Sequence, residues 1–332
     1  MIITKTPFRM SFFGGGTDLK EYFENYGGAV LSTTFDKFCY VTVRHLPHFF
    51  EYKNLLTYSK IEQTNNVDEL EHPLVRNAMK YLDMHDLCIS YDADLPARSG
   101  LGTSSSFAVG LLNAFHALKG QYTSKEQLAC EAIHVERVLC QESGGWQDQI
   151  AASYGGMNRI SFGPDGFEVN PVIIQKERKE RLNENILLFF TGFSRFSSEI
   201  EKEKAKAIRD KTAELREIAK MVDVGEQILT DRHGDLDEFG RLLHESWQLK
   251  RGIGNGISTD ALDDIYQSAI RHGALGGKLL GAGGGGFFIF YTPQDYQESV
   301  KQALKDLLYV PFRFEDSGTK ILYYRPEDYV AE

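Results

Sequence analysis

The chain has 332 residues, of which 42% are hydrophobic and 25% charged, a composition typical of a soluble globular protein with about two domains. Its formal net charge of −10 argues against nucleic acid or an anionic membrane as the main partner, because both favour basic surfaces. We expect a cytoplasmic protein, since the N-terminal residues lack the apolar core of a signal peptide and no apolar run approaches the ~18 residues of a membrane helix.

The N-terminal half predicts short strands followed by two helices. Strand-like runs cover residues 38–43 and 87–95, and helix-like runs cover 107–118 and 125–140. The helix over 107–118 is apolar on almost every side, which predicts a position at the centre of its domain.

The C-terminal half predicts strands and helices arranged around a glycine-rich loop. In chain order we expect a strand at 186–191, a helical region over about 197–250, a helix at 260–272, a strand at 278–280, the loop at 281–286, a strand at 287–291, a helix at 294–308 and a strand at 321–324. This order indicates a split β-α-β arrangement, with antiparallel strands in its middle and helices on one face. The sequence between about 162 and 185 is polar and irregular, so we place the boundary between domains 1–170 and 171–332 there.

The glycine run G-A-G-G-G-G at 281–286 fits the spacing G-x-G-x-x-G of dinucleotide-binding proteins. A dinucleotide fingerprint opens a helix, however, whereas this run leads into the apolar strand at 287–291. The chain also has no G-x-x-x-x-G-K-[ST] motif, which excludes a P-loop. Taken alone, the run is either a plain hairpin connection or part of a functional site.

A second glycine-rich stretch, P-A-R-S-G-L-G-T-S-S-S-F at 96–107, leads directly into the apolar helix. Helix N-termini carry unpaired amides and the positive end of the helix dipole, which together favour a bound anion. The stretch therefore predicts a phosphate site, in which Ser104 or Ser105 offers a hydroxyl to Mg²⁺ or to a phosphate oxygen. For any one of these serines, simple capping of the helix is the alternative.

Two acidic residues are candidates for metal binding and catalysis. Glu136 falls on the apolar stripe of the helix over 125–140, where it is either solvated at the edge of the stripe or bound to a metal. Asp148 follows the glycine pair at 144–145, and an isolated Asp in that position is most often a cap.

The N-terminal stretch P-F-R-M-S-F-F-G-G-G-T-D-L at 7–19 holds further candidates. Arg9 alternates with apolar neighbours in a predicted strand, and three glycines then lead to Thr17 and Asp18. In a purely structural interpretation, Arg9 is an exposed strand residue, and Thr17 and Asp18 cap a helix at 19–26.

Together, these motifs resemble those of the GHMP small-molecule kinases. The resemblance rests on P-x-R and G-x-T-D near the start, P-x-x-S-G-L-G-x-S-S before a buried helix, an acid about a dozen residues before G-x-x-D, and a late G-K-L-x-G-A-G-G-G-G. The motifs run from residue 7 to 288 in the order of that superfamily, which includes galactokinase, homoserine kinase, mevalonate kinase and phosphomevalonate kinase. More narrowly, F-F-G-G-G-T-D-L, R-S-G-L-G-T-S-S-S-F, G-G-W-Q-D-Q and G-G-K-L-L-G-A-G-G-G-G-F look like the D-glycero-D-manno-heptose 7-phosphate kinases.

The resemblance implies an α+β fold with two domains, an N-terminal domain like domain 2 of ribosomal protein S5 and a ferredoxin-like C-terminal domain. The active site would lie between them. The resemblance also implies transfer of a phosphoryl group from ATP to the anomeric C1 hydroxyl of a sugar phosphate, with Mg²⁺ bridging the β- and γ-phosphates. In the heptose kinases, this step lies on the route to nucleotide-activated heptose.

Motif by motif, the resemblance assigns roles to individual residues. Asp148 matches the catalytic base, and Arg9 would orient it and stabilise developing negative charge. Glu136 takes the place of the Mg²⁺-binding glutamate, beside Ser104 and Ser105, although its distance to Asp148 is one residue longer than in mevalonate kinases. The ATP phosphate loop comprises Pro96, Ser99, Gly100, Leu101, Gly102, Thr103, Ser104, Ser105 and Ser106.

The same resemblance places sugar-binding residues in the first and last glycine-rich motifs. The substrate-binding candidates there are Gly15, Gly16, Thr17, Asp18, Gly283 and Gly284. An acceptor that already carries phosphate also needs local cations, and Arg195 and Lys250 are the candidates. Each of these two cations is otherwise an ordinary solvated charge.

Other functions fit the same motifs. The chain could phosphorylate a sugar without phosphate, such as fucose or galactose, or a mevalonate-type alcohol, or it could be a regulator that senses sugars without catalysis. The joint presence of Arg9, Glu136, Asp148 and the serines argues against a silent regulator, because a pure binder needs no base. We expect ATP and a sugar phosphate as partners, and we consider a homodimer for the oligomeric state.

Overall fold

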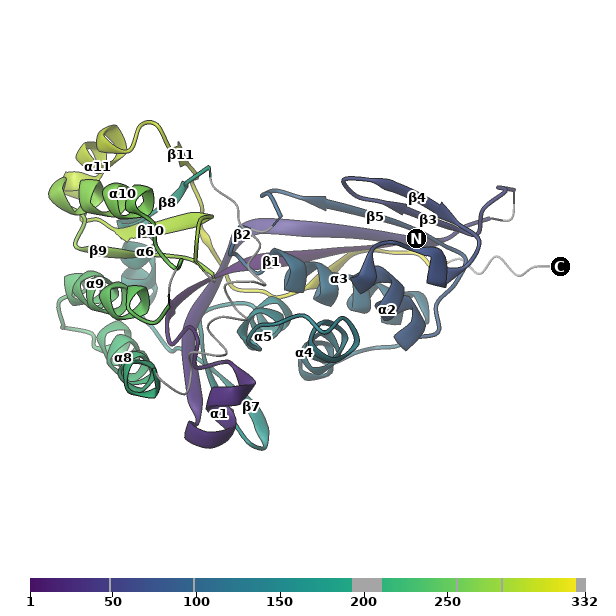
Figure 1. The fold of residues 1–332 in the computed structure, drawn as a ribbon, viewed down its shortest axis with the longest axis horizontal. Helices are drawn as coiled ribbons and strands as arrows, with labels where there is room; N and C mark the ends of the chain where they lie inside the picture. Colours follow the sequence, from purple (N-terminus) through teal and green to yellow (C-terminus); the bar gives the residue numbers. More distant parts are fainter. Residues whose placement is uncertain (48, 98, 193–210, 255, 282, 327–332) are drawn as a thin grey trace.

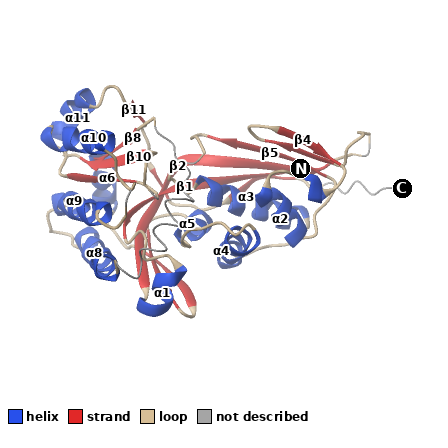
Figure 2. Cartoon of the chain, viewed as in Figure 1, coloured by secondary structure: helices blue, strands red, loops and turns tan. Residues whose placement is uncertain are grey.

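The computed structural model describes residues 1–47, 49–97, 99–192, 211–254, 256–281 and 283–326. Figures 1 and 2 show two β-sheets, one in each half of the molecule, with helices packed against both. This arrangement confirms the predicted α+β class. Among the described helices, none is both long and apolar enough to cross a bilayer.

The larger sheet is built mainly from the N-terminal half and has the strand order β13-β1-β2-β5-β3-β4; β6 and β12 also pair with β2, and β7 pairs with β6. Its strands are β1 (Ile2–Phe13), β2 (Gly28–His45), β3 (Asn54–Thr57), β4 (Ile61–Thr64), β5 (Leu87–Ala93), β6 (Asn158–Gly163), β7 (Gly166–Pro171), β12 (Phe314–Glu315) and β13 (Lys320–Tyr324). β3 pairs with β5 in parallel, and the other pairs are antiparallel.

The long strand β2 joins the parts of this sheet, since its first residues pair with β6 and its last residues pair with β5. β1 runs antiparallel to β2, and its register shifts between Pro7 and Phe8 and again between Ser11 and Phe13. Irregularities of this kind re-aim side chains, often next to active sites. They bracket Arg9, which is buried in the strand.

The helices of the N-terminal half cover one face of the larger sheet (Figure 1). They are α1 (Lys20–Tyr26), α2 (Pro73–Tyr81), α3 (Thr103–Leu118), α4 (Lys125–Ile133) and α5 (Gln147–Tyr154), with a short 3₁₀ turn at Val67–Glu69. α3 is the predicted apolar helix, and it lies at the centre, between the strands β1 and β2 and the helices α4 and α5. The predicted helix at 125–140 is instead α4 followed by a π-helix at His134–Leu139, a rare element that is frequent at functional sites.

The smaller sheet has the order β11-β8-β10-β9, and all its pairs are antiparallel. Its strands are β8 (Ile186–Phe190), β9 (Gly276–Leu279), β10 (Phe287–Tyr291) and β11 (Leu308–Tyr309). The described helices of this half are α6 (Lys176–Asn185), α8 (Thr212–Thr230), α9 (Asp237–Arg251), α10 (Asp260–Arg271) and α11 (Gln297–Ala303), with a 3₁₀ turn at Gln294–Tyr296.

Strand β10 has an unbroken apolar sequence because both of its faces are buried. Phe288 and Phe290 pack in one core with Trp247 of α9. Ile289, on the opposite face, packs in another core that includes Phe12 of β1. The second core therefore holds the smaller sheet against the N-terminal half.

One predicted strand, at 321–324, lies in the larger sheet and not in the smaller, C-terminal sheet as predicted. The run at 321–324 was expected to complete the C-terminal sheet, but within β13 it pairs with β1, where Ile2 is opposite Tyr324 and Lys5 is opposite Lys320. The edge of the smaller sheet is formed by β11 instead. An apolar run predicts a strand but carries no information about which neighbour it pairs with.

Candidate active site

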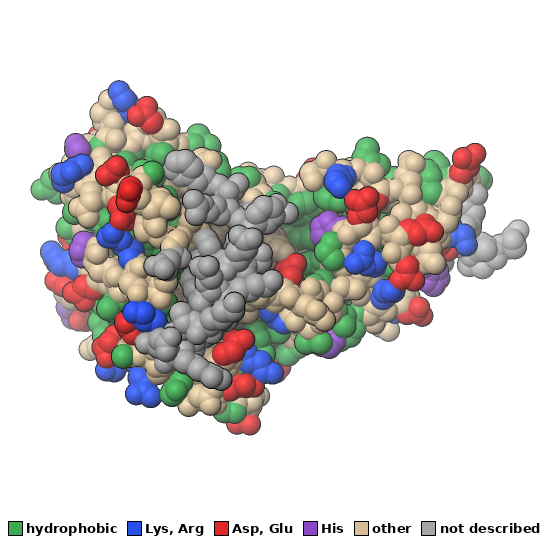
Figure 3. Space-filling model, viewed as in Figure 1, with side chains coloured by type: hydrophobic (Ala, Val, Ile, Leu, Met, Phe, Trp, Pro, Cys, Tyr) green, Lys and Arg blue, Asp and Glu red, His purple; other side chains and the backbone are tan. Residues whose placement is uncertain are grey.

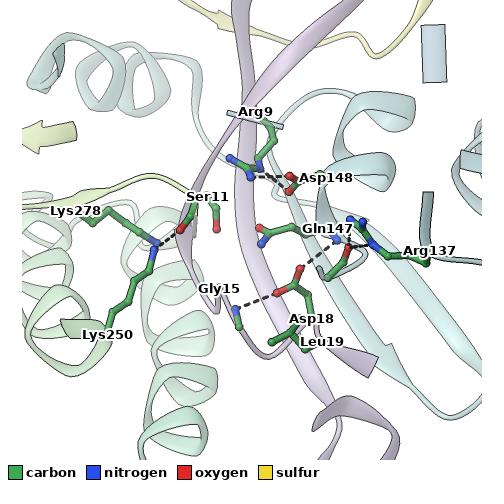
Figure 4. A pocket seen from close by; sticks show the side chains of 13 residues that line it. Arg9, Ser11, Gly15, Asp18, Leu19, Arg137, Gln147, Asp148, Lys250 and Lys278 are labelled. Atoms are coloured by element: carbon green, nitrogen blue, oxygen red, sulfur yellow. Dashed lines mark hydrogen bonds and ion pairs between the residues drawn. The ribbon is translucent and has the colours of Figure 1, made fainter. Parts of the chain in front are cut away.

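A pocket lies where the two halves meet, and its walls come from both of them (Figure 4). The residues that line it are Arg9, Ser11, Gly15, Gly16, Asp18, Leu19, Arg137, Gly145, Gln147, Asp148, Lys250, Lys278 and Gly281. On the part of the surface described in Figure 3, basic and acidic side chains are interspersed. The pocket differs from that surface, because four cationic side chains line it beside two carboxylates.

Arg9 of β1 and Asp148 of α5 form the central ion pair of this pocket. Arg9 Nε donates to Asp148 Oδ1 and Nη2 donates to Oδ2, both at 2.8 Å, which is the bidentate geometry of a strong charge-assisted pair. Arg9 Nη1 donates to the carbonyl oxygen of Gly100 at 2.7 Å. The arginine is 4% exposed and the aspartate 22%, so the carboxylate keeps contact with the pocket while the arginine fixes its direction.

Two serines at the start of α3 form hydrogen bonds with Glu136, although they lie more than 30 positions before it in the sequence. Ser104 Oγ donates to Glu136 Oε1 at 3.0 Å, and Ser105 Oγ donates to Oε2 at 2.7 Å. Gln149 Nε2 also donates to Glu136 Oε2. Glu136 is 1% exposed and lies in the π-helix, so the structure brings the predicted metal residues together at one helix N-terminus.

Asp18 lies buried at the floor of the pocket. Its Oδ1 accepts from the amide of Gly16 at 3.0 Å, and its Oδ2 accepts from the amide of Gln147 at 3.4 Å. Burial raises the pKa of the Asp18 carboxyl above its usual value, and the nearby charge of Asp148 raises it further, whereas these amides lower it. A Cβ on Gly145 would lie 1.8 Å from Asp18 Oδ2, so this position requires glycine for Asp18 to keep its place.

The two glycine-rich loops pack against each other, backbone against backbone. A Cβ on Gly100 would lie 2.4 Å from the carbonyl oxygen of Leu280, and a Cβ on Gly286 would lie 2.3 Å from that of Ser99. Gly100 also has a positive φ of 81°, which favours glycine. The late glycine run is therefore more than a hairpin connection, because it supports the serine-bearing loop.

Several predicted residues serve the local fold without lining the pocket. Ser106 Oγ donates to the carbonyl oxygen of Pro7 at 2.9 Å. Thr17 Oγ1 lies within hydrogen-bonding distance of the carbonyl oxygens of Gly14 and Ala29, each at 2.8 Å. Thr17 and Asp18 therefore do not cap α1, whose N-cap is Leu19.

The remaining predicted residues take various positions. Leu101 and Ser99 are buried, Thr103 opens α3 after Gly102, and Pro96 is exposed, all outside the residues that line the pocket. Gly283 and Gly284 pack against Ile257. Arg195, with its neighbours Ser194, Ser197 and Ser198, falls outside the described residues.

Lys250, which the sequence analysis names as a candidate substrate-binding cation, lines the pocket, and the structure adds Lys278 beside it (Figure 4). Lys250 Nζ donates to Gly281 at 2.7 Å and to Leu279 at 3.2 Å, in both cases to the main-chain carbonyl oxygen. Lys278 Nζ donates to the carbonyl oxygen of Phe12 at 2.8 Å. Both lysines are more than nine-tenths buried.

Sequence reasoning missed other polar residues of the site, namely Ser11, Arg137, Gln147 and Gln149. The signal for Arg137 was its position next to Glu136, and the two glutamines flank Asp148. Ser11 lies between the motifs P-x-R and G-x-T-D and belongs to neither. Its hydroxyl is nevertheless buried in the pocket wall and has no partner among the described residues.

Comparison with known proteins identifies the family. Residues 73–156 match the GHMP kinases N terminal domain, and residues 226–310 match GHMP kinases C terminal. The chain is 31% identical to the D-glycero-alpha-D-manno-heptose 7-phosphate kinase of Campylobacter jejuni, over 96% of this chain and 98% of that protein.

Solved structures agree with this assignment. A D-glycero-D-manno-heptose 1-phosphate kinase from Bacteroides thetaiotaomicron has a TM-score of 0.72 and 26% identity, over 97% of this chain and 99% of that one. The galactokinase of Lactococcus lactis in complex with galactose has a TM-score of 0.74 at 17% identity, over 97% and 95% of the two chains, and shows the same two-domain fold. The chain is therefore a member of the GHMP kinases, a family of phosphotransferases that use ATP as the phosphate donor and a hydroxyl group as the acceptor.

Proposed function

We propose that this protein transfers the γ-phosphate of ATP to the anomeric C1 hydroxyl of D-glycero-D-manno-heptose 7-phosphate, giving the 1,7-bisphosphate for nucleotide-heptose synthesis. The observation that carries the proposal is the Arg9–Asp148 pair in a pocket rich in cations, in a chain related along its length to a heptose 7-phosphate kinase. The two heptose kinases named above differ in the phosphate that their names give to the acceptor, at C7 or at C1. Both names describe a heptose that already carries one phosphate.

Asp148 is the proposed proton acceptor. The acceptor hydroxyl attacks the γ-phosphorus, the bond from that phosphorus to the ADP oxygen breaks, and the hydroxyl proton passes to the Asp148 carboxylate. Arg9 holds both oxygens of that carboxylate, which is 22% exposed and lines the pocket. Because Arg9 is buried, its charge acts in surroundings that water screens poorly.

The start of α3 is the proposed site for the ATP phosphates, with Mg²⁺ beside it. Within the described part of the chain, no group of three or more His, Cys, Asp or Glu side chains could hold a metal. The oxygen donors of Ser104, Ser105 and Glu136 nevertheless fit Mg²⁺, which commonly takes one or two carboxylates and completes its shell with phosphates and water. When bound there, Mg²⁺ would neutralise charge on the β- and γ-phosphates.

Asp18 is the proposed anchor for the sugar ring. Its carboxylate is fixed by the amides of Gly16 and Gln147, and it lines the same pocket as Asp148. A buried carboxyl of this kind recognises sugar hydroxyls by hydrogen bonds, and it loses those bonds when the hydroxyl is absent.

An acceptor panel tests the proposal. ADP release would be measured with heptose 7-phosphate, heptose 1-phosphate, free heptose, fucose, galactose and mevalonate, with the Asp148→Asn variant as the control. We expect the highest kcat/KM with heptose 7-phosphate, and ³¹P NMR should show a new phosphate at the anomeric carbon. A higher kcat/KM with another acceptor would show that the assigned substrate is wrong. No turnover with any acceptor would favour a protein that senses sugars without catalysis.

A further inference from the structure

We infer that Ser11 and Gln147 bind hydroxyl groups of the acceptor and so set the choice of acceptor, an inference that rests on the proposed function. In the described part of the chain, Ser11 Oγ and Gln147 Oε1 are buried side-chain atoms without a hydrogen-bond partner, and both residues line the pocket. The other atoms of this kind belong to residues outside the pocket. An unpaired buried polar atom costs free energy, and a ligand that pairs with it removes that cost.

The two residues reach the pocket from different elements. Ser11 lies in β1 two positions after Arg9, so the regular pairing between the two register shifts places both side chains on the same face of the strand. Gln147 is the first residue of α5, directly before Asp148. In Figure 4 the side chains of Ser11 and Gln147 lie between the Arg9–Asp148 pair and Asp18.

The backbone around these two residues leaves space for a ligand. A Cβ on Gly15 would lie 3.9 Å from Ser11 Oγ, and Gly15 itself lines the pocket, so no side chain covers the serine from that position. The main-chain amide of Gln147 donates to Asp18, which fixes the start of α5 while the side-chain oxygen keeps no partner. Both atoms are therefore held where an acceptor bound to Asp18 and Asp148 would lie.

The chemistry of these groups favours an acceptor with several hydroxyls. Gln147 Oε1 and the carboxylates of Asp18 and Asp148 only accept hydrogen bonds, whereas the Ser11 hydroxyl both donates and accepts. Three accepting groups require three donors, which a sugar supplies with its reacting hydroxyl and two neighbouring ones. A mevalonate-type alcohol has only one hydroxyl besides the one that reacts, so it would leave an acceptor unpaired. The pair Ser11 and Gln147 therefore selects sugars over simple alcohols.

Binding measurements on three variants test the inference. Ser11→Ala and Gln147→Met would be compared with Ser153→Ala, a control whose hydroxyl is also buried and unpartnered but lies outside the pocket. Calorimetry with a saturating non-hydrolysable ATP analogue would give Kd for heptose 7-phosphate and for its 2-, 3- and 4-deoxy forms. We expect each pocket variant to weaken binding of heptose 7-phosphate by about 5- to 50-fold, and the control by less than about 2-fold.

The deoxy sugars show whether the contact is direct. Removing the hydroxyl that a residue binds should weaken binding to the parent protein, but should weaken it little further in the variant that lacks that residue. Losses that are additive for every deoxy sugar would overturn the inference, because they would mean that water, and not the sugar, pairs with Ser11 and Gln147.

Thermal unfolding separates a binding role from a structural one. Because neither atom has a partner among the described residues, each pocket variant should unfold at the same or a higher temperature than the parent when no sugar is present. The rise in melting temperature on adding heptose 7-phosphate should be smaller in both pocket variants than in Ser153→Ala. A lower melting temperature without sugar, together with an unchanged Kd, would show a structural role and overturn the inference.

The outcomes also separate this inference from the proposed function. Weaker sugar binding in the pocket variants, without ADP release from the parent, would reject the reaction alone. Turnover of heptose 7-phosphate with an unchanged Kd in both pocket variants would reject the role of Ser11 and Gln147 alone. A parent protein that binds mevalonate more tightly than every sugar would overturn both.

Discussion

Replacing Arg9 with methionine tests the ion pair on which the site is built. Arg9 makes three charge-assisted hydrogen bonds of 2.7 to 2.8 Å, and removing one partner of a fully buried pair costs about 3–5 kcal/mol. Asp148 is 22% exposed, so water can solvate part of the charge that the variant leaves behind. We therefore expect the free energy of unfolding to fall by a smaller amount, about 2 kcal/mol.

The effect on catalysis should be larger than the effect on stability. Arg9 is already oriented before the reaction, and loss of one preorganised donor to developing charge typically lowers kcat by about 10²–10³-fold. Urea unfolding followed by circular dichroism would give the stability, and ADP release at saturating ATP would give kcat.

A matched control separates the site from ordinary ion pairs. Arg159 pairs with Asp223 at 2.6 Å and with Glu226 at 2.9 Å, but it is 30% exposed and lies outside the pocket. Arg159→Met should change the free energy of unfolding by about 0–1 kcal/mol and leave kcat unchanged. In the double variant Arg9→Met/Asp148→Asn, the destabilisation should be less than the sum of the single changes. Strict additivity, or a kcat for Arg9→Met within about 2-fold of the parent, would refute the reasoning.

Three further predictions concern the pocket walls. Because the folded-state pKa of Asp18 is raised above 3.8, its contribution to stability is present at low pH and is lost as pH rises through that folded-state pKa. Asp18→Asn should therefore raise the melting temperature at pH 7, and the gain should shrink as the pH falls toward 4; an equal gain at both pH values would contradict this. Gly145→Ala places a methyl group 1.8 Å from Asp18 Oδ2, so the KM for the sugar should rise at least about 10-fold while the KM for ATP stays within about 2-fold of the parent value. Steady-state kinetics would measure both constants, and an equal rise in the two would contradict the prediction. Gly100→Ala would strain a positive φ and press on Leu280, which should raise KM for ATP and lower the melting temperature, whereas an unchanged KM for ATP would argue against the loop contact.

The sequence motifs predicted much of the site because each motif carries a local physical signature. Glycines next to serines before an apolar helix favour an anion site, and the structure brings Glu136 into contact with those serines. The shared role of Arg9 and Asp148 could be predicted only from the order of the motifs, because the two residues are 139 positions apart and neither is distinctive alone. The family resemblance supplied that order.

Other features left no mark in the sequence. Lys278 is a single cation in a short apolar strand, and periodicity cannot show that its ammonium group meets the carbonyl oxygen of Phe12 in the other half. The partner of β13 was equally hidden, because the pairing of a short run depends on contacts between the two ends of the sequence. Gln149 donates to Glu136, which lies in the π-helix, and the sequence pattern predicted an ordinary helix there.

The pairing of β13 with β1 has a consequence for how the protein is made. During synthesis, β1 has an open edge until the chain has been translated beyond Tyr324, the residue that pairs with Ile2. Contacts this distant along the chain are slow to form, and an unpaired edge can join another chain in the meantime. If β13 does not pair with β1 soon after synthesis, we therefore expect aggregates in which chains pair through β1, the strand that also carries Arg9.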